Sequence, residues 1–194
     1  TDPQDFVVKH YVDSVAICSF SQMREARSII DVGTGAGFPG IPLAILYPEK
    51  QFLLMDSLNK RIKIIEEISR EIGLENVAFR HGRAEELARE KDYREAFDLC
   101  VSRAVANLAV LSEYCLPFVR VGGSFAAYKT ESAEEELKSS LPAIRLLGGQ
   151  LEENSQLHIK GYDLDHRILF IKKVKNTLAK YPRKAGTPAK EPLK

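Results

Sequence analysis

Short apolar runs alternate with segments of helical periodicity along most of this chain. Before residue 28, side chains such as Val7, Tyr11 and Val15 recur at the spacing of one helical face, and Asp2 followed by Pro3 is typical of a helix start. Apolar runs predict strands at 28–32, 51–55, 76–80, 97–102 and 124–129. Helical spacing is found at 41–46, 58–72, 84–91, 108–119 and 131–147.

Capping and turn residues mark the ends of several of these elements. Ser57 is placed to cap the helix at 58–72, and Gly73 follows that helix at the position where a left-handed residue ends it. The Gly122-Gly123 pair predicts a turn into the fifth strand. Gly148-Gly149 predicts another turn after the last helix.

The end of the pattern predicts a hairpin, because strands at 151–159 and 167–174 are joined by a polar turn at 161–166. The whole alternation predicts an α/β fold with a doubly wound, Rossmann-like sheet of seven strands. We expect this sheet to be mostly parallel, with one antiparallel edge strand. The expected domains are an N-terminal helical segment at 1–27, truncated because the chain begins without Met, a central domain at 28–175, and a basic C-terminal tail at 176–194 packed on it.

Charge is distributed unevenly along the chain, although 28 Lys and Arg almost balance 27 Asp and Glu. Residues 172–194 carry eight basic residues and one acidic residue, whereas residues 1–171 carry 20 basic against 26 acidic. A hydrophobic content of 44% over 194 residues excludes a disordered, collagen-like or disulfide-rich protein. A net charge of +1 therefore hides a basic tail on an acidic body, and it does not exclude a nucleic-acid partner.

Other residue types exclude several classes of protein. Cys18, Cys100 and Cys115 form no CxxC pair, which predicts reduced, buried thiols. Because no apolar run reaches 18 residues and no leader opens the chain, we expect a cytoplasmic protein without a membrane partner. The four histidines lack the spacing of metal ligands, so we expect no metal.

The loop after the first strand is the most informative stretch. Gly33, Gly35 and Gly37 alternate where a strand passes into a helix, so the backbone can approach a ligand closely. The spacing is GxGxG, with Phe38 next, and differs from the dinucleotide pattern GxGxxG and from a P-loop. Asp56 ends the second strand, where a carboxylate can accept hydrogen bonds from two ribose hydroxyls. Together these features favour a nucleoside cofactor without a pyrophosphate, namely S-adenosylmethionine (SAM).

Further residues at strand ends are candidates for the same site. Asp31 could hold the ammonium group of the methionine moiety or could simply cap the loop backbone, and the sequence leaves both interpretations open. Ala84 and Glu85 follow the third strand, where adenine is expected. Arg103 follows the fourth strand, where the methyl group and its acceptor would meet, and its alternative role is a surface salt bridge to the acidic body.

The chemistry of methyl transfer limits which atoms could accept the methyl group. In-line displacement at a sulfonium requires mainly positioning, and the [ND]PP[YF] motif of amino-group methylation is absent. Cys100 lies inside a strand, where it is poorly placed to attack cytosine. A ring nitrogen such as guanine N7 needs no base, which fits a chain without a Ser-His-Asp or paired-carboxylate arrangement.

The basic tail is a candidate RNA-binding segment. Lys180, Arg183 and Lys184 are interleaved with Tyr181 and prolines that would hold the tail extended along phosphates. The alternative is a disordered, solubilising tail.

The combination of these segments resembles the bacterial ribosomal RNA small-subunit methyltransferase G family, also called glucose-inhibited division protein B. The resemblance rests on DVGTGAGFPGIP at 31–42, DSLNKR at 56–61, SRA at 102–104 and KYPRKAGTP at 180–188. It implies a class I SAM-dependent methyltransferase fold and methylation of guanine N7 in the decoding region of 16S ribosomal RNA, with low-level streptomycin resistance upon loss of the methyl group. The family assigns no catalytic base, so Arg103 is the best candidate for positioning. The implied SAM contacts are Gly33, Phe38, Asp56, Ser57, Leu58, Ala84, Glu85 and Arg103, and Gly35 of the glycine loop is a further candidate contact.

Two other functions remain open at this point. A small-molecule methyltransferase would act without RNA, and a non-enzymatic ribosome-binding factor would bind RNA without making a methylated product. We expect a monomer whose partner is 16S ribosomal RNA or the small ribosomal subunit.

Overall fold

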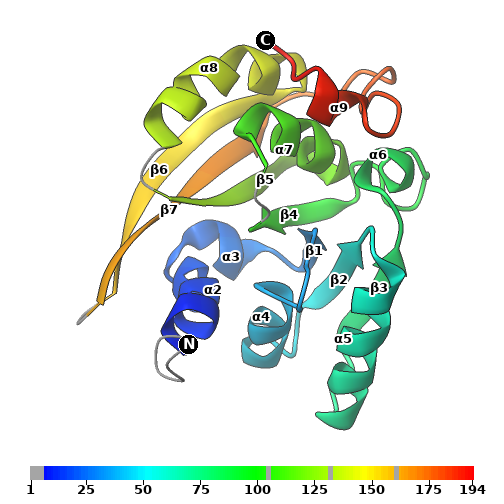
Figure 1. The fold of residues 1–194 in the computed structure, drawn as a ribbon, viewed down its shortest axis with the longest axis vertical. Helices are drawn as coiled ribbons and strands as arrows, with labels where there is room; N and C mark the ends of the chain where they lie inside the picture. The colour runs from blue at the N-terminus through cyan, green and yellow to red at the C-terminus, as the bar shows by residue number, and fades with distance from the viewer. Residues whose placement is uncertain (1–6, 104–105, 131–132, 160–161) are drawn as a thin grey trace.

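Seven strands form one sheet in the order β3-β2-β1-β4-β5-β7-β6 (Figure 1). This computed structural model describes residues 7–103, 106–130, 133–159 and 162–194. The strands are β1 Ser28–Val32, β2 Gln51–Asp56, β3 Val77–His81, β4 Phe97–Ser102, β5 Val119–Thr130, β6 Gly149–Ile159 and β7 Tyr162–Lys173.

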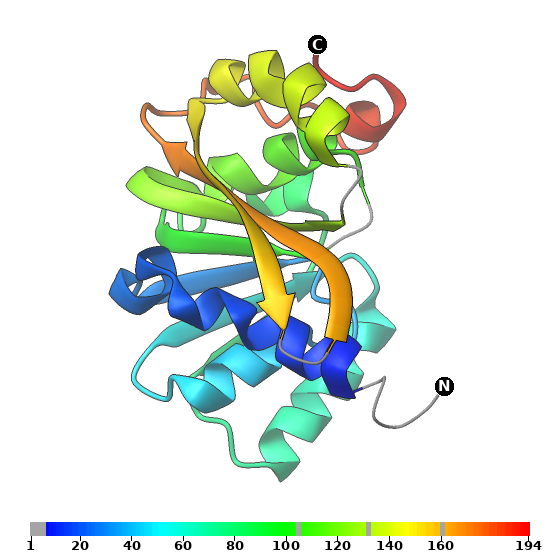
Figure 2. The ribbon, with the colours of Figure 1, turned by 90° about the vertical axis from the view of Figure 1, so that its left-hand side faces the viewer.

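The sheet is mixed, as predicted from the alternating pattern. The pairs β3-β2, β2-β1, β1-β4 and β4-β5 are parallel, whereas β7 is antiparallel to both β5 and β6. After β5 the chain passes through a helix and continues as β6, which is the edge strand and is not adjacent to β5. The following strand, β7, then lies between β5 and β6. The antiparallel strand therefore lies next to the edge strand β6. Figure 2 shows that the long hairpin curves down to the N-terminal helices.

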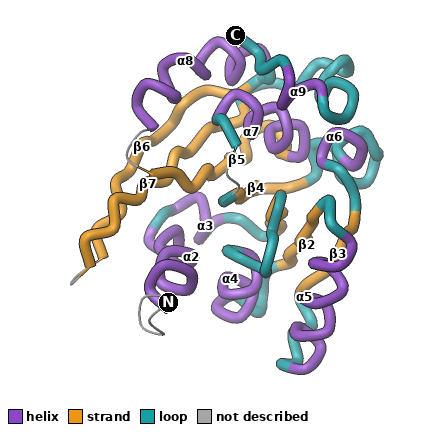
Figure 3. The backbone as a smooth tube through the Cα atoms, in the orientation of Figure 1, coloured by secondary structure: helices purple, strands orange, loops and turns teal. Residues whose placement is uncertain are grey.

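Helices cover both faces of the sheet (Figure 3). Their bounds are η1 Val7–Val12, α2 Asp13–Val15, η2 Ala16–Ser19, α3 Ser21–Glu25, α4 Gly40–Leu46, α5 Asn59–Glu71, α6 Ala84–Leu87, α7 Leu108–Cys115, η3 Leu116–Phe118, α8 Ala133–Leu146 and α9 Thr187–Lys190. Among the described residues, no helix is both long and apolar enough to cross a membrane.

Neighbouring residues of the central strands supply two separate cores. Ile30 and Cys100 pack in one core, which includes α7 and the C-terminal Tyr181. Ile29 and Leu99, each one position earlier, pack in the other core with α4. Because side chains alternate across a sheet that is covered on both faces, apolar residues stand at consecutive positions of these strands and not only at every second one.

Several predicted boundaries were wrong. Ser57 does not cap the following helix, because α5 begins at Asn59 and the residue at the N-cap is Leu58. The Asp56 carboxylate accepts the Leu58 N–H instead, at 2.9 Å. The helix predicted at 84–91 is the short α6, which ends at Leu87. The starts predicted at Asp2-Pro3, at 131 and at 161 lie outside the described residues.

The Gly122-Gly123 pair lies inside β5 and does not form a turn before it. The register between β4 and β5 shifts there, from Phe97 opposite Val119 to Leu99 opposite Ser124. A Cβ atom on Gly123 would lie 2.5 Å from the carbonyl oxygen of Asp98, so glycine is needed for this close approach of two strands.

Candidate SAM site at the carboxyl ends of the strands

A cavity of about 190 Å³ lies at the carboxyl ends of β1, β2 and β3. This is the edge of a doubly wound sheet at which ligands normally bind. It brings together five of the nine residues expected to contact SAM, and Tyr114 and Leu111 of α7 close it. Its lining residues are Val32, Gly33, Met55, Asp56, Ser57, Gly82, Arg83, Ala84, Glu85, Ala106, Leu111 and Tyr114.

The glycine loop is held against the second strand by backbone hydrogen bonds. The N–H groups of Gly33 and Thr34 both donate to the carbonyl oxygen of Met55, each at 3.0 Å. Gly33 and Gly35 have φ angles of +76° and +61°, in the left-handed region that residues with a Cβ rarely adopt. The alternating glycines are therefore required by the path of the backbone around the cavity.

Asp56 connects the loop to the start of α5. Its Oδ2 accepts the N–H of Gly35 at 3.0 Å and lies 3.4 Å from the Arg61 guanidinium, while its Oδ1 accepts the Leu58 N–H. The side chain is 4% exposed. A carboxylate has about four acceptor positions, so Asp56 can hold the loop and still accept a hydroxyl from a ligand.

Asp31 is fully buried beneath the same loop. Its Oδ2 accepts the N–H of Gly40 at 2.9 Å, so the carboxylate does cap the loop backbone. Its Oδ1 and the buried hydroxyl of Thr34 have no hydrogen-bond partner within the described part of the chain. Burial raises the pKa of Asp31 to about 7, although the nearby Thr34 side chain, the Gly40 N–H and the positive charge of Arg103 act in the opposite direction. An unused acceptor is thus buried beneath the glycine loop.

The side of the cavity where adenine is expected is formed by α6 and α7. Glu85 is 5% exposed, and its Oε1 accepts the N–H of Gly186 from the C-terminal segment at 2.8 Å. Burial raises the pKa of Tyr114, and the charges of Glu85 and Glu113 reinforce this effect. The Tyr114 hydroxyl is therefore protonated at neutral pH and can donate a hydrogen bond.

Arg103 and Phe38 are not among the residues that line the cavity, and they contact the N-terminal helices instead. The Arg103 Nη1 lies 3.2 Å from Oδ2 of the buried Asp13, and its Nη2 lies 3.1 Å from Nδ1 of His10. The guanidinium lies 5.3 Å from the centre of the Phe38 ring. Asp13 also binds Nδ1 of His166 at 2.7 Å. Arg103 thus links the fourth strand, the glycine loop and the N-terminal segment.

The predicted basic tail carries less free charge than its composition suggests. Arg183 binds both carboxylate oxygens of Glu113 in α7, at 3.0 Å and 2.7 Å. Lys173 is fully buried and lies 3.0 Å from Glu95. Lys180 and Lys184, in contrast, are exposed.

Sequence reasoning missed the acidic partners Asp13, Glu95 and Glu113. For Glu113 a signal existed, because this lone acid interrupts the apolar helix from Leu108 to Cys115. Buried acids generally need a cationic partner, but the identity of that partner, 70 residues away, was not readable from the sequence.

The donor set of the cavity fits SAM. Apolar walls from Val32, Met55 and Leu111 can flank a base, while Asp56 and Glu85 offer carboxylate acceptors to hydroxyl and amino groups. The unused Oδ1 of Asp31 is the acceptor type that an ammonium group requires. No group of three or more His, Cys, Asp or Glu side chains that could hold a metal occurs in the described ranges.

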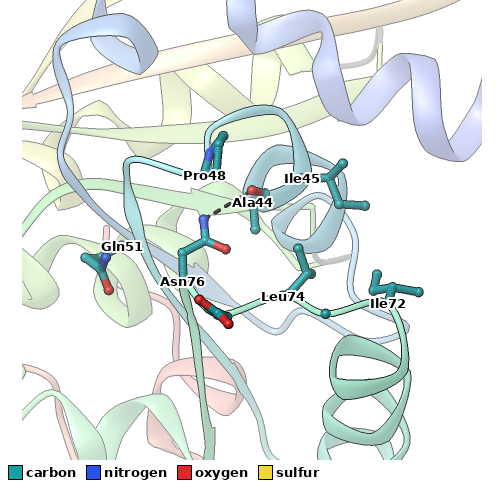
Figure 4. Close-up of a pocket in the computed structure, with 9 residues that line it drawn as sticks. Ala44, Ile45, Pro48, Gln51, Ile72, Leu74 and Asn76 are labelled. Atoms are coloured by element: carbon teal, nitrogen blue, oxygen red, sulfur yellow. Dashed lines mark hydrogen bonds between the residues drawn. The ribbon is translucent and has the colours of Figure 1, made fainter.

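A larger hollow of about 630 Å³ lies at the opposite ends of the strands, their amino ends, between α4 and the end of α5 (Figure 4). Gln51 and Asn76 line it, at the amino ends of β2 and β3. The Asn76 amide donates to the carbonyl oxygen of Ala44 at 3.1 Å and so closes the loop there (Figure 4). Because its polar groups serve the backbone in this way, we do not assign this hollow as the cofactor site.

Comparison with known proteins gives one consistent result. Residues 1–169 match the family model described as GidB, rRNA small subunit methyltransferase G. A ribosomal RNA small subunit methyltransferase G of Clostridium tetani is 52% identical over 194 residues, which is 100% of this chain and 81% of that protein. The protein of the same name from Clostridium novyi is 51% identical over 193 residues, with 100% and 79% coverage.

Solved structures agree on the fold. A SAM-dependent methyltransferase from Aquifex aeolicus superposes with a TM-score of 0.65 at 15% identity, covering 89% of this chain and 94% of that one. At this level of identity the likeness concerns the fold alone, and it confirms the predicted class I methyltransferase architecture.

Proposed function

We propose, on the premise that this chain belongs to the rRNA small subunit methyltransferase G family, that it transfers a methyl group from SAM to guanine N7 in the decoding region of 16S ribosomal RNA. The observation that carries the proposal is the family match together with the cavity at the strand ends, which has the acceptors that a nucleoside requires. The acceptor atom and its place in the RNA rest on the resemblance of the chain to this family.

The residues of the chain would act mainly by positioning. Gly33 and Gly35 shape the backbone next to the ligand, Asp56 and Ser57 lie on the ribose side, and Ala84 with Glu85 lies on the adenine side. Bound SAM supplies an electrophilic methyl group, and guanine N7 already has an accessible lone pair, so no residue has to remove a proton before transfer. Arg103 is the candidate for orienting the RNA, because it ties the rim of the sheet to the N-terminal helices.

RNA contact by the C-terminal segment is best assigned to Lys180 and Lys184, whose side chains are exposed. Arg183 is a weaker candidate because Glu113 neutralises it. If the two lysines each contact one phosphate, replacing both with alanine should flatten the log–log salt dependence of single-stranded RNA binding by about 1.4. Lys138→Ala, an exposed change in α8, should leave the slope unchanged. An equal slope in the double variant would remove these lysines from the RNA interface.

The proposed location of the protein is the cytoplasm, and its proposed oligomeric state is a monomer.

Label transfer tests the proposed reaction. The protein is incubated with methyl-labelled SAM and either naked 16S ribosomal RNA or small ribosomal subunits, and the RNA is then digested to nucleosides. We expect label in 7-methylguanosine. Label in a small molecule without RNA would favour a small-molecule methyltransferase, and RNA binding without labelled product would favour a non-enzymatic ribosome-binding factor.

A further inference from the structure

The C-terminal segment 176–190, here called the C-terminal strap, crosses the two helices that line the adenine side of the cavity (Figure 1). We propose that this strap is a structural part of the SAM site and that Gly186 and Arg183 are positioning residues for α6 and α7. The proposal rests on the proposed function of the cavity, and it gives the strap a role other than RNA binding.

The first contact joins the strap directly to a residue that lines the cavity. The N–H of Gly186 donates to Oε1 of Glu85 at 2.8 Å. Glu85 is 5% exposed and belongs to α6, a helix of only four residues. So short a helix has few internal hydrogen bonds, so the strap supplies a constraint that α6 lacks. The orientation of the Glu85 carboxylate therefore depends on where Gly186 lies.

The second contact holds the neighbouring helix. Glu113 of α7 is fully buried, and its oxygens accept the Arg183 main-chain N–H at 2.7 Å as well as the guanidinium. The same helix carries Leu111 and Tyr114 into the cavity wall. A buried carboxylate is stable only with its partners in place, so loss of the strap would leave an uncompensated charge beneath that wall.

Further bonds fix the strap along its length. The Arg94 guanidinium donates to the carbonyl oxygens of Thr177 at 2.8 Å and Tyr181 at 3.0 Å. It also donates to the carbonyl oxygen of Ala88, the residue directly after α6, at 3.2 Å. Tyr181 is 6% exposed and packs in the core that contains α7. The strap is thus held next to both helices by hydrogen bonds to its backbone as well as by the Arg183–Glu113 ion pair.

If a docked strap favours the binding-competent position of Glu85, bound SAM must favour the docked strap by the same factor. The coupling can therefore be measured in either direction, without any RNA and without catalysis.

The first experiment measures SAM affinity by calorimetry. We expect Arg183→Ala to weaken SAM binding about tenfold, within the usual range of coupling between sites. Lys190→Ala is the matched control, because it removes a positive charge from the same segment at an exposed position in α9. Asp98→Asn controls for loss of stability alone, since Asp98 lies at the opposite end of β4 and binds Arg120 at 2.6 Å. Both controls should keep the affinity of the unmodified protein.

The second experiment needs no substitution and remains valid if Arg183→Ala does not fold. Hydrogen exchange of the Arg183 and Gly186 amides is followed in the unmodified chain with and without saturating SAM. We expect exchange at both amides to slow about tenfold when SAM is bound. The main-chain amide of Asn76, at the amino ends of the strands, should be unaffected. Equal exchange in both states, or SAM affinity that is the same in Arg183→Ala and Lys190→Ala, would overturn the proposal. If the unmodified protein bound no SAM at all, the assignment of the cavity would fail instead.

Discussion

We expect Asp31→Asn to change the way in which the stability of the fold responds to pH. The carboxyl group is fully buried, one oxygen accepts the Gly40 N–H, and the other has no partner among the described residues. Burial raises the pKa of Asp31 from 3.8 to about 7. Asparagine has almost the same shape and can keep the bond to Gly40, but it does not titrate.

The magnitude follows from the difference in proton binding between the folded and unfolded states. Between pH 3.8 and pH 7 the folded protein keeps the proton on Asp31 and the unfolded chain loses it, so the free energy of unfolding falls as the pH rises. Each pH unit in this window corresponds to about 1.4 kcal/mol. From pH 5 to pH 8 this group should therefore lower the stability of the unmodified protein by about 3 kcal/mol, a loss that Asp31→Asn does not suffer.

Urea unfolding at pH 5, 6, 7 and 8, without SAM, measures this difference directly. The free energy of unfolding of Asp31→Asn minus that of the unmodified protein should increase by about 3 kcal/mol across the series, because all other groups titrate equally in both proteins. Asp98→Asn is the control. The pKa of Asp98 is lowered to about 2, since hydrogen bonds from Ser28, Arg120 and Arg27 outweigh its burial, so its folded and unfolded forms are both ionised above pH 5. The change in the free energy of unfolding caused by Asp98→Asn should therefore be the same at all four pH values. A pH-independent difference for Asp31→Asn would refute the reasoning.

Three further predictions concern the site and its supports. Gly33→Val should abolish SAM binding in calorimetry, because a branched side chain is strained at a φ of +76° and would project into the cavity that Gly33 lines. Normal SAM affinity in this variant would contradict the assignment of the cavity. Arg103→Ala should reduce methyl transfer to 16S ribosomal RNA at least about tenfold with an unchanged circular dichroism spectrum, and full activity would make Arg103 a bystander. Lys173→Met should lower the free energy of urea unfolding by about 3 kcal/mol, because it removes the buried ammonium that pairs with the partly exposed Glu95 and donates to the carbonyl oxygens of Leu116 and Val119. A loss below about 1 kcal/mol would mean that these contacts are dispensable.

Much of the fold, and the grouping of candidate site residues at the strand ends, were predictable from local features of the sequence. Phe97–Ser102 forms β4 as expected, and Gly73 follows α5 with a φ of +72°. The glycine loop and Asp56 lie together at the strand ends because parallel strands bring their carboxyl ends to one edge. These features depend on the order of residues within one strand, loop or helix, so the sequence alone is sufficient to locate them.

The tertiary structure alone decided which distant groups meet. The sequence suggested that Arg183 was free to bind RNA, but its partner Glu113 lies 70 positions away, and their pairing depends on how the C-terminal strap packs on α7. Arg103 likewise contacts Asp13 of the N-terminal segment and not the cavity itself. Charges and propensities are properties of single residues and their neighbours, whereas ion pairs between distant segments exist only after the sheet and both cores have brought those segments together. The net charge of the tail was therefore readable from the sequence, and its contacts with Glu85 of α6 and Glu113 of α7 were not.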